Sequence, residues 1–339
     1  MNRLLADLGL TVPVIAAPMS GGPSTPELVV AAASAGSIGF LGAGYKSPDL
    51  LVQQIASVRH VPFGVNLFAP NPVPVDPADF HRYATAIRDE AARYGLDVDQ
   101  VDPTEDDDHW HDKIDVLLAD PVPLVSFTFG IPDVPVLAAL RRAGTVVAQT
   151  VTSADEARQA VAAGVDLLVV QSAAAGGHSG TLTPGQPPPL IPVEDLVGDI
   201  AALVDLPLLA AGGIATASAV SSALRVGADA VMVGTVLLRS QESGASATHR
   251  AALADPARTR TVTTRAFTGR PARGLHNDFI ARYEAIAPLG YPALHHLTSP
   301  IRRAAAAAGD PERVNLWAGT GFAAATEEPA AAILARLAG

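Results

Sequence analysis

Two segments built on one plan, AGVDLLVV at residues 163–170 and VGADAVMV at residues 226–233, decide the fold of this chain. In each, a glycine stands where a helix would end, and a short apolar run rich in valine and leucine follows almost directly. An apolar run without alternating polar residues is typical of a parallel strand that is covered on both faces. The two segments therefore predict helix–glycine–strand units of an α/β protein.

Further segments of this kind bring the number of predicted strands to eight. The runs occupy residues 14–18, 38–42, 63–67, 124–128, 145–149, 166–170, 206–210 and 229–233. Helix-start signals lie between them: Thr25 precedes a proline and an acid, and Ser153 with Glu156 forms a capping box. Strands that alternate with helices predict a parallel sheet, and eight strands close a (β/α)8 or TIM barrel.

Two stretches depart from the spacing of one helix per strand. Residues 70–120 contain a predicted helix near 78–94 and an acidic loop, so we expect an elaborated crossover over the barrel mouth or flank. Residues 239–311 follow the eighth strand and are rich in arginine, which predicts a smaller, mostly helical lid domain. We expect a barrel of residues 1–238 that residues 312–339 complete, with the lid inserted after the eighth strand.

Composition removes several classes of function. The 339 residues include 23 basic and 34 acidic side chains, and a formal net charge of −11 argues against a nucleic-acid partner. The chain has no cysteine, which excludes disulfides, thiolate-bound metals and a cysteine nucleophile. No run of 18 apolar residues occurs, and Asp7 and Pro13 interrupt the apolar start, so we expect a cytoplasmic protein without a membrane partner.

The residues that follow the predicted strands are the candidates for a functional site, because TIM barrels carry their sites at the carboxyl ends of the strands. Nearly all of them are small, amide or hydroxyl residues. Gly212, Gly213 and Gly234 follow the last two strands, where bare backbone N–H groups can approach phosphate oxygens. They predict a phosphorylated ligand, and the alternative is that these glycines only form tight turns.

Polar side chains stand at the ends of two other predicted strands or in the loop that follows. The amides of Asn66 and Gln171 could pair with a heterocycle such as a flavin, or they could satisfy loop backbone. His178 lies in a loop framed by glycines and is the outstanding candidate for an acid or base, against the alternative of a loop histidine without function. Met19 could pack on a bound ring or belong to the core.

Three other clusters are weaker candidates. His109 and His111 stand beside aspartates, but nothing sets a ligand geometry, so we expect a solvated acidic loop and no metal site. The glycines at 42 and 44 belong to a dinucleotide fingerprint that lacks its third glycine. The arginines of residues 264–274 could bind an anionic ligand or pin the lid through ion pairs.

Taken together, these motifs resemble the nitronate monooxygenase family, formerly called 2-nitropropane dioxygenases. The resemblance rests on APMSGG at 17–22, GVNL at 64–67, Gln171, AGGH at 175–178, AGGI at 211–214, VGT at 233–235, FTGRPAR at 267–273 and LWAG at 316–319. The family consists of FMN-dependent (β/α)8 barrels, so the resemblance implies this fold, an FMN cofactor and an oxidoreductase. One departure is Gly319-Thr-Gly321, where the family leads us to expect glutamine between the glycines.

The resemblance also implies roles for individual residues. His178 would be the catalytic base that removes the α-proton of a nitroalkane or acts on the bound nitronate. FMN would take an electron from the nitronate and dioxygen would accept it, with a carbonyl compound and nitrite as products. Met19, Phe68 and Phe129 would form an apolar wall for a small substrate. The positions that would hold FMN are Ala17, Met19, Asn66, Gln171, Gly176, Gly177, Gly212, Gly213, Met232, Val233, Gly234 and Thr235.

Other functions remain open on the same barrel. Related FMN enzymes reduce enoyl thioesters or quinones with NAD(P)H, and this chain shows no clear nicotinamide fingerprint. A lyase or isomerase would want a lysine or carboxylate at a strand end, and we find none there. A flavin-binding module without turnover would have no need of His178. The expected partners are a small-molecule substrate and dioxygen, and a homodimer is a possible assembly.

Overall fold

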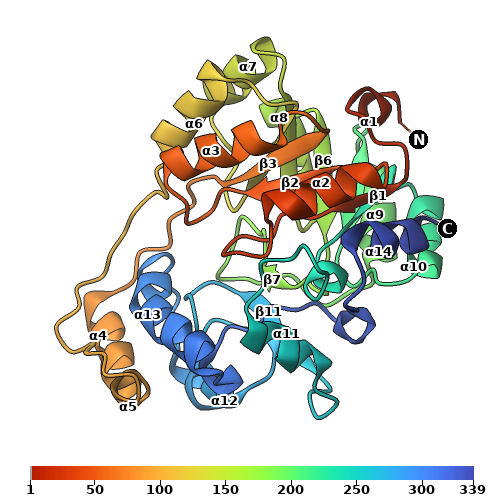
Figure 1. Cartoon of the computed structure of the whole chain (residues 1–339). Coiled ribbons are helices and arrows are strands. Elements are labelled where there is room, and N and C mark those ends of the chain that lie inside the picture. The colour runs from red at the N-terminus through yellow and green to blue at the C-terminus, as the bar shows by residue number, and fades with distance from the viewer. Residues whose placement is uncertain (1) are drawn as a thin grey trace.

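The computed structural model describes residues 2–339, and its centre is a closed barrel of parallel strands (Figure 1). The last strand pairs with the first, so that Val233 lies opposite Ala16 and closes the barrel. The barrel strands are β1 (Val14–Ala16), β2 (Gly39–Gly42), β3 (Phe63–Phe68), β4 (Leu124–Thr128), β5 (Val146–Val151), β6 (Leu167–Gln171), β8 (Leu208–Ala211) and β9 (Ala230–Val233). Each overlaps one of the predicted strands, and the predicted TIM barrel is confirmed.

Helices cover the outside of the barrel (Figure 1). They are α2 (Pro26–Ser34), α3 (Pro48–Val58), α6 (Trp110–Ala119), α7 (Val134–Arg142), α8 (Ala154–Ala163), α9 (Val193–Ala201), α10 (Ala217–Arg225) and α14 (Ala330–Ala338). The main hydrophobic core lies between these helices and the strands and includes Leu51, Val125 and Val231. A separate cluster fills the barrel interior, where Leu5 of α1 (Arg3–Asp7) packs with Phe40 and closes the amino end.

The start of α8 shows how one residue of a local capping signal can serve a distant loop. Ser153 accepts a hydrogen bond from the backbone N–H of Glu156 at 3.2 Å, as a capping box requires. The Glu156 carboxylate, however, accepts from the backbone and hydroxyl of Thr152, the hydroxyl of Thr181 and the backbone of Leu182. The predicted capping box is therefore half formed, because this buried carboxylate fastens the loop after β6 instead of returning to Ser153.

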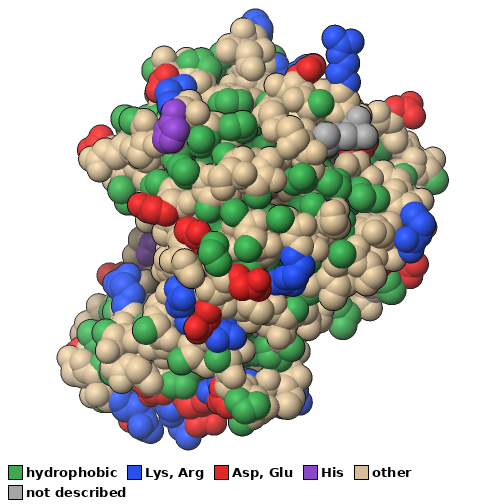
Figure 2. Space-filling model, turned by 45° about the vertical axis from the view of Figure 1, so that its right-hand side comes forward, with side chains coloured by type: hydrophobic (Ala, Val, Ile, Leu, Met, Phe, Trp, Pro, Cys, Tyr) green, Lys and Arg blue, Asp and Glu red, His purple; other side chains and the backbone are tan. Residues whose placement is uncertain are grey.

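A second hydrophobic cluster, which we call the lid core, lies beside the barrel. Its helices are α4 (Pro77–Ala86), α5 (Arg88–Ala92), α12 (Asp278–Tyr283) and α13 (Ala293–Ala308), and α11 (Ala247–Ala254) lies next to α13. Phe80 of α4 packs in this core with Phe267 and Phe279, whose rings stack 4.7 Å apart. The predicted lid, residues 239–311, includes only one of the two segments that build this core. The other segment carries α4 and α5. Figure 2 shows the molecular surface narrowing between the larger upper part and the smaller lower part.

A small antiparallel sheet joins the barrel loops to the lid segment, residues 239–311. It consists of β7 (Gly177–His178), β10 (Thr261–Thr264) and β11 (Ala272–Leu275), in the order β10-β11-β7. The sequence did not predict these strands, two of which lie in a segment expected to be mostly helical. Short 3-10 helices complete the description: η1 (Thr235–Leu237), η2 (Glu284–Ile286), η3 (Pro311–Arg313) and η4 (Phe322–Ala324). None of the helices within residues 2–339 has the length and apolar character needed to cross a bilayer.

Candidate active site

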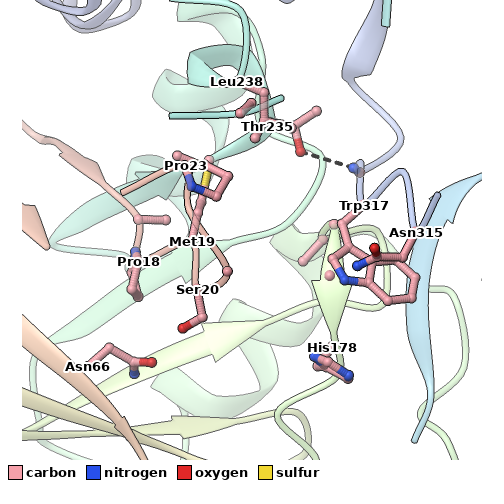
Figure 3. Close-up of a pocket in the computed structure, with 18 of the residues that line it drawn as sticks. Pro18, Met19, Ser20, Pro23, Asn66, His178, Thr235, Leu238, Asn315 and Trp317 are labelled. Carbon is pink, nitrogen blue, oxygen red and sulfur yellow. Dashed lines mark hydrogen bonds between the residues drawn. The ribbon is translucent and has the colours of Figure 1, made fainter. Parts of the chain in front are cut away.

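A cavity of about 600 Å³ opens at the carboxyl ends of the barrel strands, between the barrel and the lid segment. This volume falls within the roughly 300–1,000 Å³ that is usual for ligand sites. Figure 3 shows residues from distant parts of the chain around it, among them Met19, Asn66, His178 and Trp317. The predicted base and all the residues predicted to hold FMN line this cavity: His178, Ala17, Met19, Asn66, Gln171, Gly176, Gly177, Gly212, Gly213, Met232, Val233, Gly234 and Thr235.

Bare backbone forms the wall of the cavity at the ends of β8 and β9. Gly212 and Gly213 have φ angles of +117° and +74°, a conformation that residues with a Cβ rarely adopt. A Cβ at Gly234 would lie 3.4 Å from the sulfur of Met19, so the two segments meet closely there. The hydroxyl of Thr235 accepts a hydrogen bond from the backbone N–H of Gly319 at 2.9 Å (Figure 3). The wall thus offers main-chain groups without side chains in front of them, which suits a phosphate.

Asn66 reaches the cavity from the middle of β3. Its Nδ2 donates to the Ser126 hydroxyl at 2.9 Å and to the Thr128 hydroxyl at 3.0 Å, which sets the orientation of the amide. Its Oδ1 receives no hydrogen bond from any group in residues 2–339 and is not enclosed by protein. The amide therefore presents an acceptor to a ligand in the cavity.

Gln171, at the end of β6, holds the loop that carries His178. Its Oε1 accepts from the backbone N–H of Gly180 at 2.7 Å, and its Nε2 donates to the backbone carbonyl of His178 at 3.2 Å. The carboxamide of Gln171 thus donates one hydrogen bond to loop backbone and accepts one from it. This is the predicted alternative in which the amide satisfies loop backbone. Direct contact of Gln171 with a bound heterocycle stays a prediction.

The imidazole of His178 is enclosed by aromatic rings on several sides. Its ring centroid lies 5.5 Å from that of Phe129 and 5.6 Å from those of Tyr291 and Trp317. Nε2 lies 2.9 Å from the hydroxyl oxygen of Thr268. These contacts fix the position of the ring, and they leave it neutral: burial, with the positive charges of two arginines nearby, lowers the pKa of His178 to about 3.

The two arginines that lower this pKa are Arg270 and Arg302. Arg270 is completely buried, with its guanidinium carbon 4.1 Å from the ring centroid of Phe129, and it donates to the backbone carbonyl of Thr181. Arg302 lines the cavity from α13 and donates to the backbone carbonyl of His295 at 2.9 Å. Both cations make the space beside His178 favourable for a negatively charged group.

The arginines of residues 264–274 were expected to bind an anion in the site or to form surface ion pairs. Within residues 2–339, neither Arg270 nor Arg273 pairs with a carboxylate. Both are buried, and neither lines the cavity. Arg273 donates to the backbone carbonyl of Ala173 at 2.6 Å and to the hydroxyl of Thr263 at 3.1 Å. The alternative of surface ion pairs is wrong for these two side chains, which instead fasten the lid segment through hydrogen bonds to backbone carbonyls of the barrel loops.

Part of the predicted apolar wall lies elsewhere. Met19 and Phe68 line the cavity, whereas Phe129 lies behind Phe68, with ring centroids 4.5 Å apart, and supports His178. Phe129 has a φ of +83°, and a non-glycine residue adopts this conformation only where its surroundings hold it there.

The lid side of the cavity also contains residues that were not predicted from the sequence to belong to the site: Tyr45, Thr268, His295, Ser299, Arg302 and Trp317. Tyr45 follows β2 with a φ of +67° and stacks on His295 at 3.9 Å. His295, Ser299 and Arg302 recur at the four- and seven-residue spacing of one helix face. That spacing is visible in the sequence, but nothing local indicates that this face turns toward the barrel.

The acidic loop at residues 105–111 supports one of these residues. The carboxylate of Asp108 accepts the backbone N–H of Tyr45 at 2.9 Å and pairs with the ammonium of Lys113 at 2.8 Å. Lys113 is buried and also donates to the carbonyl of Ala43 at 3.0 Å. The loop was expected to be solvated, and Asp108 departs from that expectation. Within residues 2–339, no group of three or more acidic or histidine side chains has the arrangement of a metal site.

Comparison with known proteins identifies relatives with this architecture. The family described as "Nitronate monooxygenase" matches residues 2–338. A probable nitronate monooxygenase from Staphylococcus aureus (strain Newman) is 36% identical over 343 residues, which cover 99% of this chain and 96% of the relative. The solved structure of nitroalkane oxidase from Streptomyces ansochromogenes is 43% identical, with a TM-score of 0.93 and coverage of 99% of this chain and 97% of that one.

A more distant solved structure shares the same barrel. FabK from Thermotoga maritima is 26% identical, with a TM-score of 0.75, and covers 99% of this chain and 95% of that one. The family match spans nearly the whole chain, the curated relative carries the family's name, and the nitroalkane oxidase shares the fold. This chain therefore belongs to the nitronate monooxygenase family of oxidoreductase enzymes.

Proposed function

We propose that this enzyme binds FMN and uses dioxygen to oxidise alkyl nitronates and nitroalkanes to a carbonyl compound and nitrite. The observation that carries the proposal is the placement of a neutral His178 in one cavity with the bare backbone after β8 and β9. Membership in the family supports oxidation of nitronates or nitroalkanes as the class of reaction. The cofactor, the products and the base are the finer parts of the proposal.

The residues of the cavity fit a flavin mononucleotide. Gly212, Gly213, Gly234 and Thr235 would hold its phosphate through backbone N–H groups, beside the amino end of α10. The open acceptor of Asn66 suits a ring N–H of the flavin, and Ala17, Met19, Gly176 and Gly177 leave room for a flat ring system. When bound, FMN supplies the electron transfer between the nitronate and dioxygen.

The side chains around the substrate handle a proton and exclude water. His178 accepts the α-proton of a neutral nitroalkane, and the electron pair of the broken C–H bond passes into the nitro group to form the nitronate. Arg302 and the buried Arg270 stabilise the negative charge that appears in this step. Tyr291 and Trp317 pack against the imidazole and keep solvent from the reacting carbon.

The test is to purify the protein, measure bound flavin, and follow oxygen consumption with a nitroalkane and with its preformed nitronate. We expect a yellow protein that contains FMN and that converts both substrates with release of nitrite. A colourless protein that cannot be reconstituted with FMN would overturn the cofactor proposal. Flavin-loaded protein that oxidises neither substrate would overturn the proposed reaction.

A second candidate function is the NAD(P)H-dependent reduction of an enoyl thioester or quinone on the same barrel. The likeness to FabK gives it weaker support, because that identity is 26% against 43% for the nitroalkane oxidase. The two functions separate when the protein is mixed anaerobically with NADH, NADPH or a nitronate in turn. Bleaching of the flavin by the nitronate alone supports the oxidase, and rapid bleaching by a nicotinamide supports the reductase.

A further inference from the structure

We propose that Thr268 is a positioning residue that sets the tautomer of His178, with the proton on Nε2 and the lone pair of Nδ1 facing the substrate. The inference deepens the proposed function, since it names the atom that accepts the proton. Thr268 lines the cavity and is 1% exposed, so its hydroxyl has protein partners on nearly every side.

The tautomer follows from counting hydrogens. A threonine hydroxyl has one hydrogen to donate and lone pairs with which to accept. The Thr268 hydroxyl donates to the backbone carbonyl of Arg270 at 3.2 Å, and its oxygen lies 2.9 Å from Nε2 of His178. A carbonyl oxygen can only accept, so the contact with Arg270 takes the one hydroxyl hydrogen, and the Thr268 oxygen is left to accept from the imidazole. Nε2 of His178 must therefore carry the ring proton.

The opposite tautomer would leave a buried group without a partner. If Thr268 donated to Nε2, the carbonyl of Arg270 would lose the hydroxyl that caps it within a completely buried turn. A buried carbonyl without a donor is unfavourable, so the arrangement that satisfies both groups prevails. The hydrogen bond on one ring nitrogen of a histidine decides the state of the other.

The other ring nitrogen is open toward the cavity. Among the groups of residues 2–339, none forms a hydrogen bond with Nδ1 of His178. Nδ1 is also not fully enclosed by protein atoms, so a ligand in the cavity can reach it. His178 itself lines the cavity, with its ring near Trp317 in Figure 3. In the assigned tautomer, Nδ1 carries the lone pair and can take a proton from the substrate.

The turn that carries Thr268 is held firmly. The backbone N–H of Gly269 donates to the carbonyl of Arg265 at 2.8 Å, and Gly269 has a φ of +73°. A Cβ at Gly269 would lie 2.7 Å from the carbonyl oxygen of Gly290, so the turn packs directly on the backbone before α13. Two residues beyond Arg270, β11 pairs with β7 opposite His178. The lid segment thus supplies the partner that orients a base carried by a barrel loop.

The proton transfer balances with these residues alone. The α C–H bond of the nitroalkane breaks, the proton binds to Nδ1, and the electron pair moves into the nitro group. The imidazole becomes a cation, and its Nε2–H still donates to the Thr268 oxygen. In the other tautomer an N–H would face the substrate carbon and could accept nothing.

The central variant is Thr268→Val, which keeps the shape of the side chain and removes the hydroxyl. We expect kcat/KM for a neutral nitroalkane to fall about 10-fold or more, which is part of the roughly 10²–10⁴-fold that a positioned base supplies in full. Turnover of the preformed nitronate needs no base and should change about 2-fold at most. Thr268→Ser keeps the hydroxyl and should restore most of the activity on the nitroalkane.

A matched control is Thr264→Val. Thr264 is buried in the same lid segment, and its hydroxyl bonds to Glu284 and not to His178. The Thr264→Val variant also loses one buried hydroxyl. We expect its ratio of nitroalkane to nitronate turnover to stay as in the unmodified enzyme. Equal ratios in Thr268→Val and Thr264→Val would overturn the proposal.

A spectroscopic measurement tests the tautomer without any turnover. Protein labelled with 15N-histidine should show a protonated Nε2 and an unprotonated Nδ1 for His178 at neutral pH, with the signal assigned by its absence in His178→Asn. Thr268→Val should shift this signal toward a mixture of the two tautomers. A protonated Nδ1 in the unmodified protein refutes the proposal. Failure to oxidise either substrate would instead refute the proposed function and leave this result to decide the tautomer.

Discussion

His178 lies opposite Ala272 in the small antiparallel sheet, so the candidate base sits where a barrel loop pairs with the lid segment. The barrel alone supplies Gln171, which holds the carbonyl of His178. The lid segment adds the Thr268 hydroxyl, which lies against Nε2 of the imidazole. The chain that returns to the barrel after the lid segment adds Trp317, whose ring packs against the imidazole. The chemistry of the site therefore depends on contacts between parts that fold around two different hydrophobic cores.

Replacing His178 by asparagine should separate cofactor binding from proton transfer. Asparagine keeps polarity but cannot accept a proton, so turnover of a neutral nitroalkane should fall by roughly 10²–10⁴-fold. FMN should remain bound, and oxidation of the preformed nitronate should fall much less. Oxygen-electrode assays with both substrates measure this difference, and an unchanged rate on the nitroalkane would rule out His178 as the base.

Stability should fall as the pH falls below the ordinary range of histidine. The pKa of His178 is about 3 in the folded protein, against about 6.5 in an unfolded chain, so the unfolded state binds the extra proton first. The contribution of His178 to the free energy of unfolding is fully present above about pH 6.5. It is lost progressively as the pH falls toward 3. Between pH 7 and pH 5 the loss should approach about 2 kcal/mol.

Urea unfolding at pH 7 and pH 5 checks this expectation. His249 is also buried, and burial lowers its pKa to about 4, so it adds a loss of the same sign. In His178→Asn the share of His178 should disappear while that of His249 stays. Equal pH dependence of the free energy of unfolding in the two proteins would contradict the lowered pKa of His178.

Gly213→Ala should weaken FMN binding. Gly213 has a φ of +74°, and a Cβ there would lie 2.9 Å from the hydroxyl of Thr320, so the backbone that faces the proposed phosphate must move. We expect the dissociation constant for FMN to rise about 10-fold or more, about 1.4 kcal/mol. Fluorescence titration of the stripped protein with FMN measures it.

Gly164→Ala is the matched control for this change. Gly164 ends α8 with a φ of +91°, has open space around its Cβ position and does not line the cavity. Its replacement carries a similar backbone cost of about 1–2 kcal/mol and should lower stability without affecting FMN. If both variants bound FMN as tightly as the unmodified protein, the proposed phosphate site would be wrong.

Asp108→Asn should destabilise the protein and disturb the wall that Tyr45 forms. The change leaves the buried ammonium of Lys113 without its carboxylate, which should cost about 3 kcal/mol. Because Asp108 also holds the backbone of Tyr45, we expect a higher KM for the substrate. Urea unfolding and steady-state kinetics measure both effects. Asp102→Asn, an exposed position in the same crossover, should leave both unchanged.

The barrel and one half of the site could be predicted from the sequence because their determinants are local. Apolar runs, helix caps and terminal glycines mark each strand and helix within a few residues. Once eight parallel strands close, their carboxyl ends must meet, which brings Asn66, Gly213 and Gly234 together without further information.

The tertiary structure alone decided the other half of the site. Thr268 becomes a partner of His178 only through the pairing of β11 with β7, and Tyr45 meets His295 only when α13 packs against the barrel. Phe80 joins the lid core although it precedes that segment by far in the chain. These contacts join segments that are far apart in the sequence, and the local sequence pattern of one segment does not indicate its partner. The contacts are determined by the packing of distant surfaces and not by periodicity.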